Sequence, residues 1–422
     1  MTEADRSLSG TRLDPEGMVD VALRRIAARD HDVRAWLHVD AAGARAAAHR
    51  LAKAKDKGPL HGMAVGIKDV IDVRGMATTH NSLLGSAAPA LADAPCVSIL
   101  RSAGAVILGK TDTTEFAAAG RNAVTANPHA FHRTPGGSSS GSAAAVADGH
   151  VPMALATQTG GSTIRPASFC GIHALKPTWG LISREGAKLY ANSLDTIGLY
   201  ARDLAGLDLL CEVFAFGPPS PRANGGPLRI GLCHTPYWDR ADAETVAAMA
   251  DAAARLRSAG VEVVPFDLPP LFDRLEDAFS AILWREGQAA FLDLARREPA
   301  LLHADFHDRV GSAARFPNAV LRQALDLTAE ARRVIEAMMA NVDAVLAPSA
   351  PGIAPEGRGP GNPIFNQMWT QLHLPVLNLP LYRAQEAMPL GLSLVGPRYG
   401  DRTVLAVGRE IETLLGCHRP LE

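Results

Sequence analysis

Two clusters of serine and glycine between residues 133 and 177 have the residue types that acyl transfer needs. The first reads GGSSSG at 136–141 and the second reads TGGS at 159–162. Small residues let the backbone approach a reacting group and point its N–H donors toward it, and each cluster also offers hydroxyl groups. The pattern indicates an acyl-transfer site that does not depend on histidine.

A third reactive group is Lys68, which ends the apolar segment MAVGIK at 63–68. Such a segment is typical of a buried strand, and burial lowers the pKa of a lysine so that it can act as a neutral base near pH 7. The alternative is a structural lysine that pairs with Asp69 or Asp72. The residues alone leave both interpretations open.

Two short motif matches are contradicted by their surroundings. GAVILGKT at 104–111 matches a phosphate-binding loop, but its AVIL is itself a strand, which predicts a helix–glycine–strand junction with Lys110 at the strand end. GSSSG at 137–141 matches a hydrolase nucleophile elbow centred on Ser139, but the preceding NPHAFHRTPGG cannot form the strand that an elbow requires. Neither motif is expected to function.

Four segments, taken together and in this order, resemble the amidase signature family: GIKDV (66–70), RTPGGSSSGSAAAVA (133–147), TQTGGSTIRPASFCG (157–171) and NSLDTIG (192–198). The resemblance is dense from about 60 to 200, weaker at the N-terminus and in 343–415, and slight in 215–340. It implies an α/β fold in which a central mixed β-sheet is flanked by α-helices on both faces. It also implies a Ser-cisSer-Lys triad made of Lys68, Ser138 and Ser162.

The same resemblance implies a mechanism. Neutral Lys68 takes a proton from Ser138, which takes one from Ser162, so that Ser162 attacks the amide carbon and forms an acyl-enzyme. No metal or cofactor is implied. The oxyanion hole is expected from the backbone N–H groups of Thr159, Gly160, Gly161 and Ser162.

Several positions depart from the commoner family pattern. Gln158 stands where many members have Asp, Arg165 is displaced by one position, Ser140 replaces a frequent Gly, and Ser393 replaces a common Gln. These departures leave the triad untouched but are expected to alter the pocket. Asp195 is expected to brace the core rather than to touch substrate.

We expect an amidohydrolase that cleaves an amide or carbamate-type C–N bond of a small molecule and releases ammonia or an amine. Two alternatives remain open: a glutaminase subunit of a tRNA-dependent amidotransferase, which works with partner subunits, and a non-catalytic binding module on the same fold. Phe365, Trp369 and Leu372 are candidates for an apolar pocket wall, although their helical spacing equally suits a core.

The elements that must position these groups follow from apolar periodicity. We expect a single domain over 1–422, with an N-terminal helical hairpin at about 15–55 and a signature core at about 60–213. A variable lobe is expected at about 228–340, with a return to the sheet at about 343–416. A segment rich in Pro and Gly at 217–227 is expected to form a surface linker.

Composition excludes several classes of protein. The 422 residues carry 42 basic and 44 acidic side chains, so a nucleic-acid or membrane partner is not expected. A small-molecule partner is expected instead. No run of about 18 apolar residues occurs. Five cysteines without a CxxC pair suit a reducing compartment, which predicts a cytoplasmic protein. A homodimer is left open.

Overall fold

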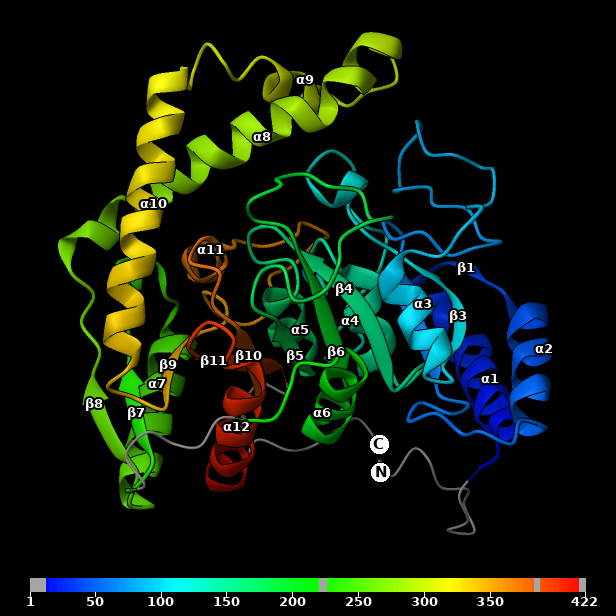
Figure 1. Ribbon diagram of the computed structural model, residues 1–422, viewed down its shortest axis with the longest axis horizontal. Helices are drawn as coiled ribbons and strands as arrows, with labels where there is room; N and C mark the ends of the chain where they lie inside the picture. The colour runs from blue at the N-terminus through cyan, green and yellow to red at the C-terminus, as the bar shows by residue number, and fades with distance from the viewer. Residues whose placement is uncertain (1–12, 220–225, 383–387, 417–422) are drawn as a thin grey trace.

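A mixed β-sheet forms the centre of the protein in a computed structural model that describes residues 13–219, 226–382 and 388–416 (Figure 1). The sheet has 11 strands in these ranges, in the order β1-β3-β2-β4-β6-β5-β10-β11-β9-β7-β8. The strands are β1 (Trp36–Val39), β2 (Ala64–Lys68), β3 (Val106–Thr111), β4 (Met153–Gln158), β5 (His173–Lys176), β6 (Thr196–Ala201), β7 (Arg229–Leu232), β8 (Glu262–Pro265), β9 (Ala344–Pro348), β10 (Val376–Tyr382) and β11 (Pro389–Val395).

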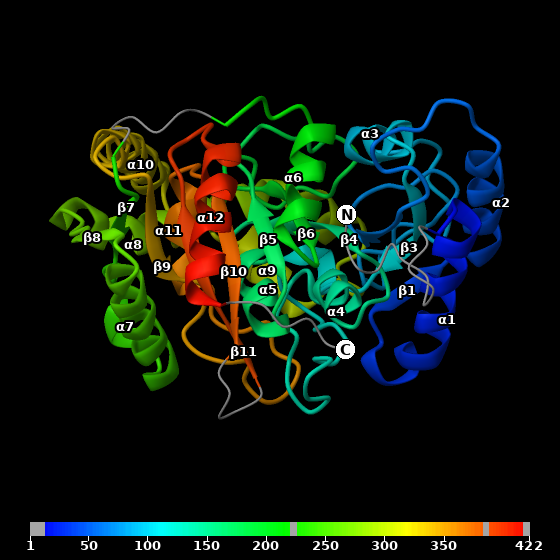
Figure 2. The same cartoon turned by 90° about the horizontal axis from the view of Figure 1, so that it is seen from below.

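Parallel and antiparallel pairs occur in groups along this sheet. β2 lies parallel to β3 and β4, and β7 lies parallel to β8 and β9, whereas the strands between these groups pair antiparallel. Figure 2 shows the sheet extended along the length of the molecule, with α1 and α2 at one end and β8 at the other. The prediction of a central mixed sheet is confirmed.

Helices cover both faces of the sheet. They are α1 (Pro15–Val33), α2 (Ala41–Ala52), α3 (Pro95–Ser102), α4 (Ser140–Ala147), α5 (Ile164–Cys170), α6 (Leu204–Val213), α7 (Ala243–Ser258), α8 (Leu275–Arg297), α9 (Ala304–Val310), α10 (Asn318–Met339), α11 (Ile364–Gln371) and α12 (Asp401–Leu415). No helix in the described ranges is long and apolar enough to cross a membrane.

Two hydrophobic cores result from the alternation of strand side chains. In β9, Val345 and Ala347 belong to one core, with side chains of α4, α5 and α11. The intervening Ala344 and Leu346 belong to the other core, with side chains of α3, α6 and α12. Because neighbouring side chains of a strand point to opposite faces, each face of the sheet is buried under its own helices.

In the N-terminal part of the described chain, α1 and α2 pack against each other, with short β1 between them in the sequence. Asp14 caps α1 by accepting the N–H of Gly17 at 2.8 Å, and Pro15 occupies the first turn, where its missing N–H costs nothing. Asp40 caps α2 in the same way by accepting the N–H of Gly43.

The segment from 228 to 340 contributes both to the sheet and to a layer above it. β7 and β8 continue the sheet, whereas α8 packs against both α9 and α10; in Figure 1, α8 and α9 extend across the upper part of the view and α10 runs down its left side. The linker expected at 217–227 lies largely outside the described residues.

The helix–glycine–strand junction predicted at Gly104 is confirmed, since α3 ends at Ser102 and β3 begins at Val106. Lys110 is more than an ordinary strand-end lysine. It is buried, and its ammonium group lies 2.8 Å from the carboxylate of Asp69. Asp69 therefore pairs with Lys110 rather than with the neighbouring Lys68.

Candidate active site

Lys68 ends β2 in a position that solvent does not reach, with 0% of the residue exposed. Its Nζ donates to the Oγ of Ser138 at 2.7 Å and to the Oγ1 of Thr157 at 2.7 Å. Burial lowers the pKa of Lys68 well below its ordinary value; the charge of Asp195 opposes this shift and that of Arg165 adds to it. A lysine in this position can lose its proton readily.

Ser138 lies in the loop that leads into α4, and this loop contacts the segment 360–363. The Gly137–Ser138 peptide is cis, as the family resemblance implies. Gly137 donates its N–H to the carbonyl of Pro360 at 3.0 Å, and a Cβ at Gly137 would come within 2.8 Å of the Cβ of Pro360. The glycine therefore lets two loops approach closely enough to hold Ser138 in place.

Ser139 is not available as a nucleophile. Its side chain is buried, and its hydroxyl donates to the carbonyl of Thr157 at 3.1 Å and accepts the N–H of the same residue at 3.3 Å. It ties the first serine cluster to the end of β4. The structure thus agrees with the expectation that the elbow motif centred on Ser139 does not function.

The second cluster, residues 159–162, forms the turn between β4 and α5. Among the described residues, none of its four backbone N–H groups donates to a protein acceptor. Backbone donors in a protein interior are nearly always paired, so four consecutive free donors mark a place for an external acceptor. A substrate carbonyl oxygen that becomes an oxyanion is such an acceptor.

Gln158 and Asp195 support this turn from behind. Gln158 caps α5, because its Oε1 accepts the N–H of Thr163 at 2.8 Å and that of Ile164 at 3.0 Å. Asp195 accepts the hydroxyl of Thr159 at 2.6 Å and also accepts two backbone N–H groups. Burial raises the pKa of Asp195 to about 6. Asp195 thus braces the turn.

Both serine clusters face one cavity of about 320 Å³. Ser138 and Ser162 line it together with the backbone of residues 159–161. In the described part of the chain, no hydrogen bond joins the two hydroxyls; in unliganded sites such contacts often form only when substrate binds. The other walls of the cavity include Tyr190, Pro363 and Gln367. Phe279 and Leu283 of α8 and Asp305 of α9 also line the cavity, and we call these three residues its roof.

Arg165 lines the same cavity although the residue is only 3% exposed. Its Nε donates to the carbonyl of Pro360 and its Nη2 to the carbonyl of Gly137, both at 2.6 Å. Burial lowers the pKa of Arg165 to about 9. No ion pair with a carboxylate neutralises it within the described ranges. The displaced arginine therefore joins two walls of the cavity.

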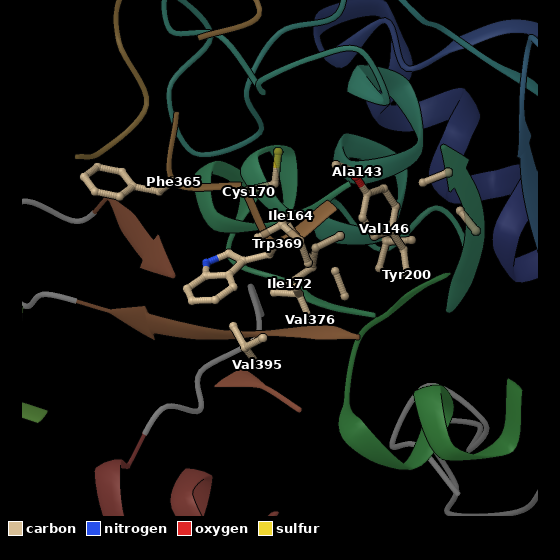
Figure 3. Close-up of a cluster of buried hydrophobic side chains, with 14 of the residues drawn as sticks. Ala143, Val146, Ile164, Cys170, Ile172, Tyr200, Phe365, Trp369, Val376 and Val395 are labelled. Atoms are coloured by element: carbon tan, nitrogen blue, oxygen red, sulfur yellow. The ribbon is translucent and has the colours of Figure 1, made fainter. Parts of the chain in front are cut away.

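Phe365, Trp369 and Leu372 do not line this cavity. They are at most 1% exposed and belong to the hydrophobic core, where Figure 3 shows Trp369 among apolar side chains of neighbouring elements. The structure places Pro363 and Gln367 of the same segment on the cavity wall instead. Sequence reasoning also missed the roof residues of α8 and α9, since no motif marks 275–310.

Comparisons with known proteins extend over nearly the whole chain. The family model described as Amidase matches residues 18–405. The chain is also similar to a protein of Roseiflexus castenholzii that is named as one of the subunits of glutamyl-tRNA(Gln) amidotransferase. The two are 33% identical over 471 residues, which cover 99% of this chain and 96% of that protein.

Two solved structures have the same fold over nearly their whole length. One is described as the crystal structure of an amidase, with a TM-score of 0.86, 27% identity, and coverage of 96% of this chain and 97% of that one. The other belongs to a vestigial protein complex that is described as revealing the evolutionary origins of an s-triazine catabolic enzyme. It has a TM-score of 0.85, 29% identity, and coverage of 97% of both chains.

Proposed function

The chain belongs to the amidase family, and on this basis we propose that it hydrolyses an amide bond of a small molecule through an acyl-enzyme on Ser162. The observation that carries the proposal is the 2.7 Å hydrogen bond from buried Lys68 to Ser138, beside a cavity that Ser138 and Ser162 both line. These contacts support the assignment of Lys68 as the base, Ser138 as the relay hydroxyl and Ser162 as the nucleophile.

In the proposed reaction, neutral Lys68 accepts the proton of Ser138 while Ser138 accepts the proton of Ser162. The Oγ of Ser162 then forms a bond with the amide carbon, and the C–N bond breaks as the relay returns a proton to the leaving nitrogen. Water, deprotonated by the same relay, attacks the acyl-enzyme and releases the carboxylic acid. Ser138 fills the role that histidine has in other serine hydrolases.

The free N–H groups of residues 159–162 are proposed to bind the oxyanion of both tetrahedral intermediates. The four residues that carry them line the cavity. Loss of one such donor typically costs about 2.7–4 kcal/mol of transition-state stabilisation. The turn is therefore expected to supply a large share of the rate enhancement.

The cavity suits a small amide. Its volume of about 320 Å³ lies at the lower end of the range for small-molecule sites, roughly 300–1,000 Å³. Phe279 and Leu283 offer an apolar wall, whereas Arg165, Asp305 and Gln367 offer polar groups. The roof comes from the part of the chain that resembles the family least, so substrate choice is proposed to depend on it.

A second candidate is a glutamine-hydrolysing subunit that passes ammonia to partner subunits. The sequence comparisons favour this candidate, because the Roseiflexus relative is named as a subunit of a tRNA-dependent enzyme and matches nearly the whole chain. The alignment extends over 471 residues whereas this chain has 422, so that relative contains segments without a counterpart here. Of the two candidates, only this one requires partner subunits.

One experiment separates these candidates. The purified chain is assayed alone for release of ammonia or amine from glutamine and from a panel of aliphatic amides, aryl amides and carbamates. Turnover of a panel compound by the chain alone supports the stand-alone amidase. Turnover of glutamine that requires added partner subunits supports the second candidate. Binding without turnover under every condition would favour the non-catalytic binding module and contradict both.

A further inference from the structure

Behind the turn of residues 159–162 lies a short chain of hydrogen bonds that ends on α11. The Nε2 of Gln158 donates to the Oγ1 of Thr370 at 2.9 Å, and that hydroxyl lies 3.0 Å from the carbonyl oxygen of Gly160. Gln158 and Thr370 are both buried, and neither lines the cavity. The contact therefore reaches the turn from outside the cavity lining.

The direction of these bonds follows from the groups that take part. The amide nitrogen of Gln158 can only donate, so it uses a lone pair of the Thr370 hydroxyl and leaves the hydroxyl proton for another acceptor. Two carbonyls lie within 3.0 Å, those of Gly160 and Asn366. Asn366 lies four residues before Thr370 in α11, where its carbonyl is positioned to accept a backbone N–H. The Gly160 carbonyl has no other donor in the described part of the chain.

The orientation of the Gly160 carbonyl fixes the orientation of the next N–H group. In a trans peptide the C=O and the N–H point in opposite directions, and the Gly160–Gly161 peptide is not cis. The carbonyl points toward Thr370, which does not line the cavity. The N–H of Gly161, one of the four free donors, consequently points away from Thr370, and Gly161 is a lining residue of the cavity.

We propose that Thr370 is a positioning residue that sets the Gly160–Gly161 peptide so that the Gly161 N–H is aimed at the substrate oxyanion, and that Gln158 directs the Thr370 proton to this task. This inference rests on the proposed function, because it presumes that the turn binds an oxyanion. Glycine on both sides of the peptide leaves the backbone free to rotate, so an external hydrogen bond is needed to select one orientation.

Thr370→Val tests the proposal, because valine keeps the shape of threonine and removes the hydroxyl. We expect kcat on the amide identified by the substrate panel to fall about 10²-fold, the lower end of the effect of losing one oxyanion donor, with KM changed less than about twofold. Thr370→Ser restores the hydroxyl and is expected to recover most of kcat.

The chain offers a matched control next to this site. The Nε2 of Gln371 donates to the Oγ1 of Thr328 at 2.6 Å, and Thr328 donates to the carbonyl of Ala324 at 2.7 Å. This is the same series of glutamine, threonine and carbonyl groups, but its carbonyl lies in α10 rather than in the turn. Thr328→Val is expected to lower stability as much as Thr370→Val and to leave kcat within about twofold of the wild type.

A second variant reverses the direction of the hydrogen bond between residue 158 and Thr370. In Gln158→Glu the carboxylate still accepts the N–H groups of Thr163 and Ile164, but it also accepts the proton of Thr370, which can then no longer bond Gly160. We expect the same loss in kcat. Full activity of both Thr370→Val and Gln158→Glu, or an equal loss in Thr328→Val, would overturn the proposal.

Phenylboronic acid provides a readout that does not depend on the substrate. It forms a reversible tetrahedral adduct with a nucleophilic serine, and a negatively charged oxygen of that adduct needs the same donors. Its dissociation constant, measured by calorimetry, is expected to rise about 10- to 100-fold in Thr370→Val and to stay unchanged in Thr328→Val. An unchanged constant in Thr370→Val overturns the positioning role. Failure of the wild type to bind the boronate would instead contradict Ser162 as nucleophile.

Discussion

The ammonium group of Lys68 and the hydroxyl of Ser138 are joined by a 2.7 Å hydrogen bond, although 70 residues separate them along the chain. β2 and the loop before α4 bring them together beneath the cavity. Thr157 accepts a second hydrogen bond from the same nitrogen. Both partners are neutral hydroxyls, so Lys68 has no carboxylate in contact that would hold its proton.

The first prediction concerns the pH dependence of the reaction. Because burial lowers the pKa of Lys68, the neutral and active form increases as pH rises through that lowered value. We expect kcat/KM to rise with pH along an acid limb and then to level. Lys68→Met should lower kcat/KM by about 10²- to 10⁴-fold. A modest loss with an unchanged acid limb would show that another group is the base.

The second prediction concerns the identity of the nucleophile. A fluorophosphonate probe is expected to label Ser162 in the wild type, to fail in Ser162→Ala, and to label Ser139→Ala, because the Ser139 hydroxyl is already bonded to the backbone of Thr157. Peptide mass spectrometry locates the label. Ser162→Ala should lose turnover while its circular dichroism spectrum stays that of the wild type. Labelling of Ser139 would contradict the assignment.

The third prediction uses the two charges near Lys68. The negative charge of Asp195 raises the pKa of Lys68 and the positive charge of Arg165 lowers it. Asp195→Asn is therefore expected to move the acid limb of kcat/KM to lower pH, and Arg165→Met to higher pH. The position of the limb is compared rather than its height, because both residues also support the site. Asp305→Asn, a carboxylate variant on the cavity roof, serves as the control and should leave the limb in place.

Much of the fold and of the site can be predicted from the sequence, since both depend on local patterns. Apolar runs such as DAVLAPS at 343–349 and PLGLSLVG at 389–396 predict the strands that are found there as β9 and β11. The resemblance of the signature segments to the amidase signature family implies that Lys68 and Ser138 meet. The resemblance also distinguishes Ser138 from Ser139, whose hydroxyl is bonded to the backbone of Thr157 in the structure.

The remaining features depend on tertiary packing and could not be predicted. Phe365 and Trp369 have a helical spacing that suits a wall or a core equally, and only the position of α11 shows that they are core. The roof residues Phe279 and Leu283 carry no motif and reach the cavity because α8 packs above it. Thr370 is an ordinary helix residue until the turn at Gly160 is placed beside it.

The last prediction concerns stability. The pair between Lys110 and Asp69 has both side chains only 1% exposed. Lys110→Met would leave the Asp69 carboxylate buried without its counterion, which typically costs about 3–5 kcal/mol. The exposed pair between Arg240 and Glu276 is the control, and Arg240→Ala should cost at most about 1 kcal/mol. Urea unfolding of both variants measures the difference. The double variant Lys110→Met with Asp69→Asn removes the buried charge, so its stability should partly recover. Equal and small losses of stability in Lys110→Met and Arg240→Ala would show that the buried pair is not coupled to folding.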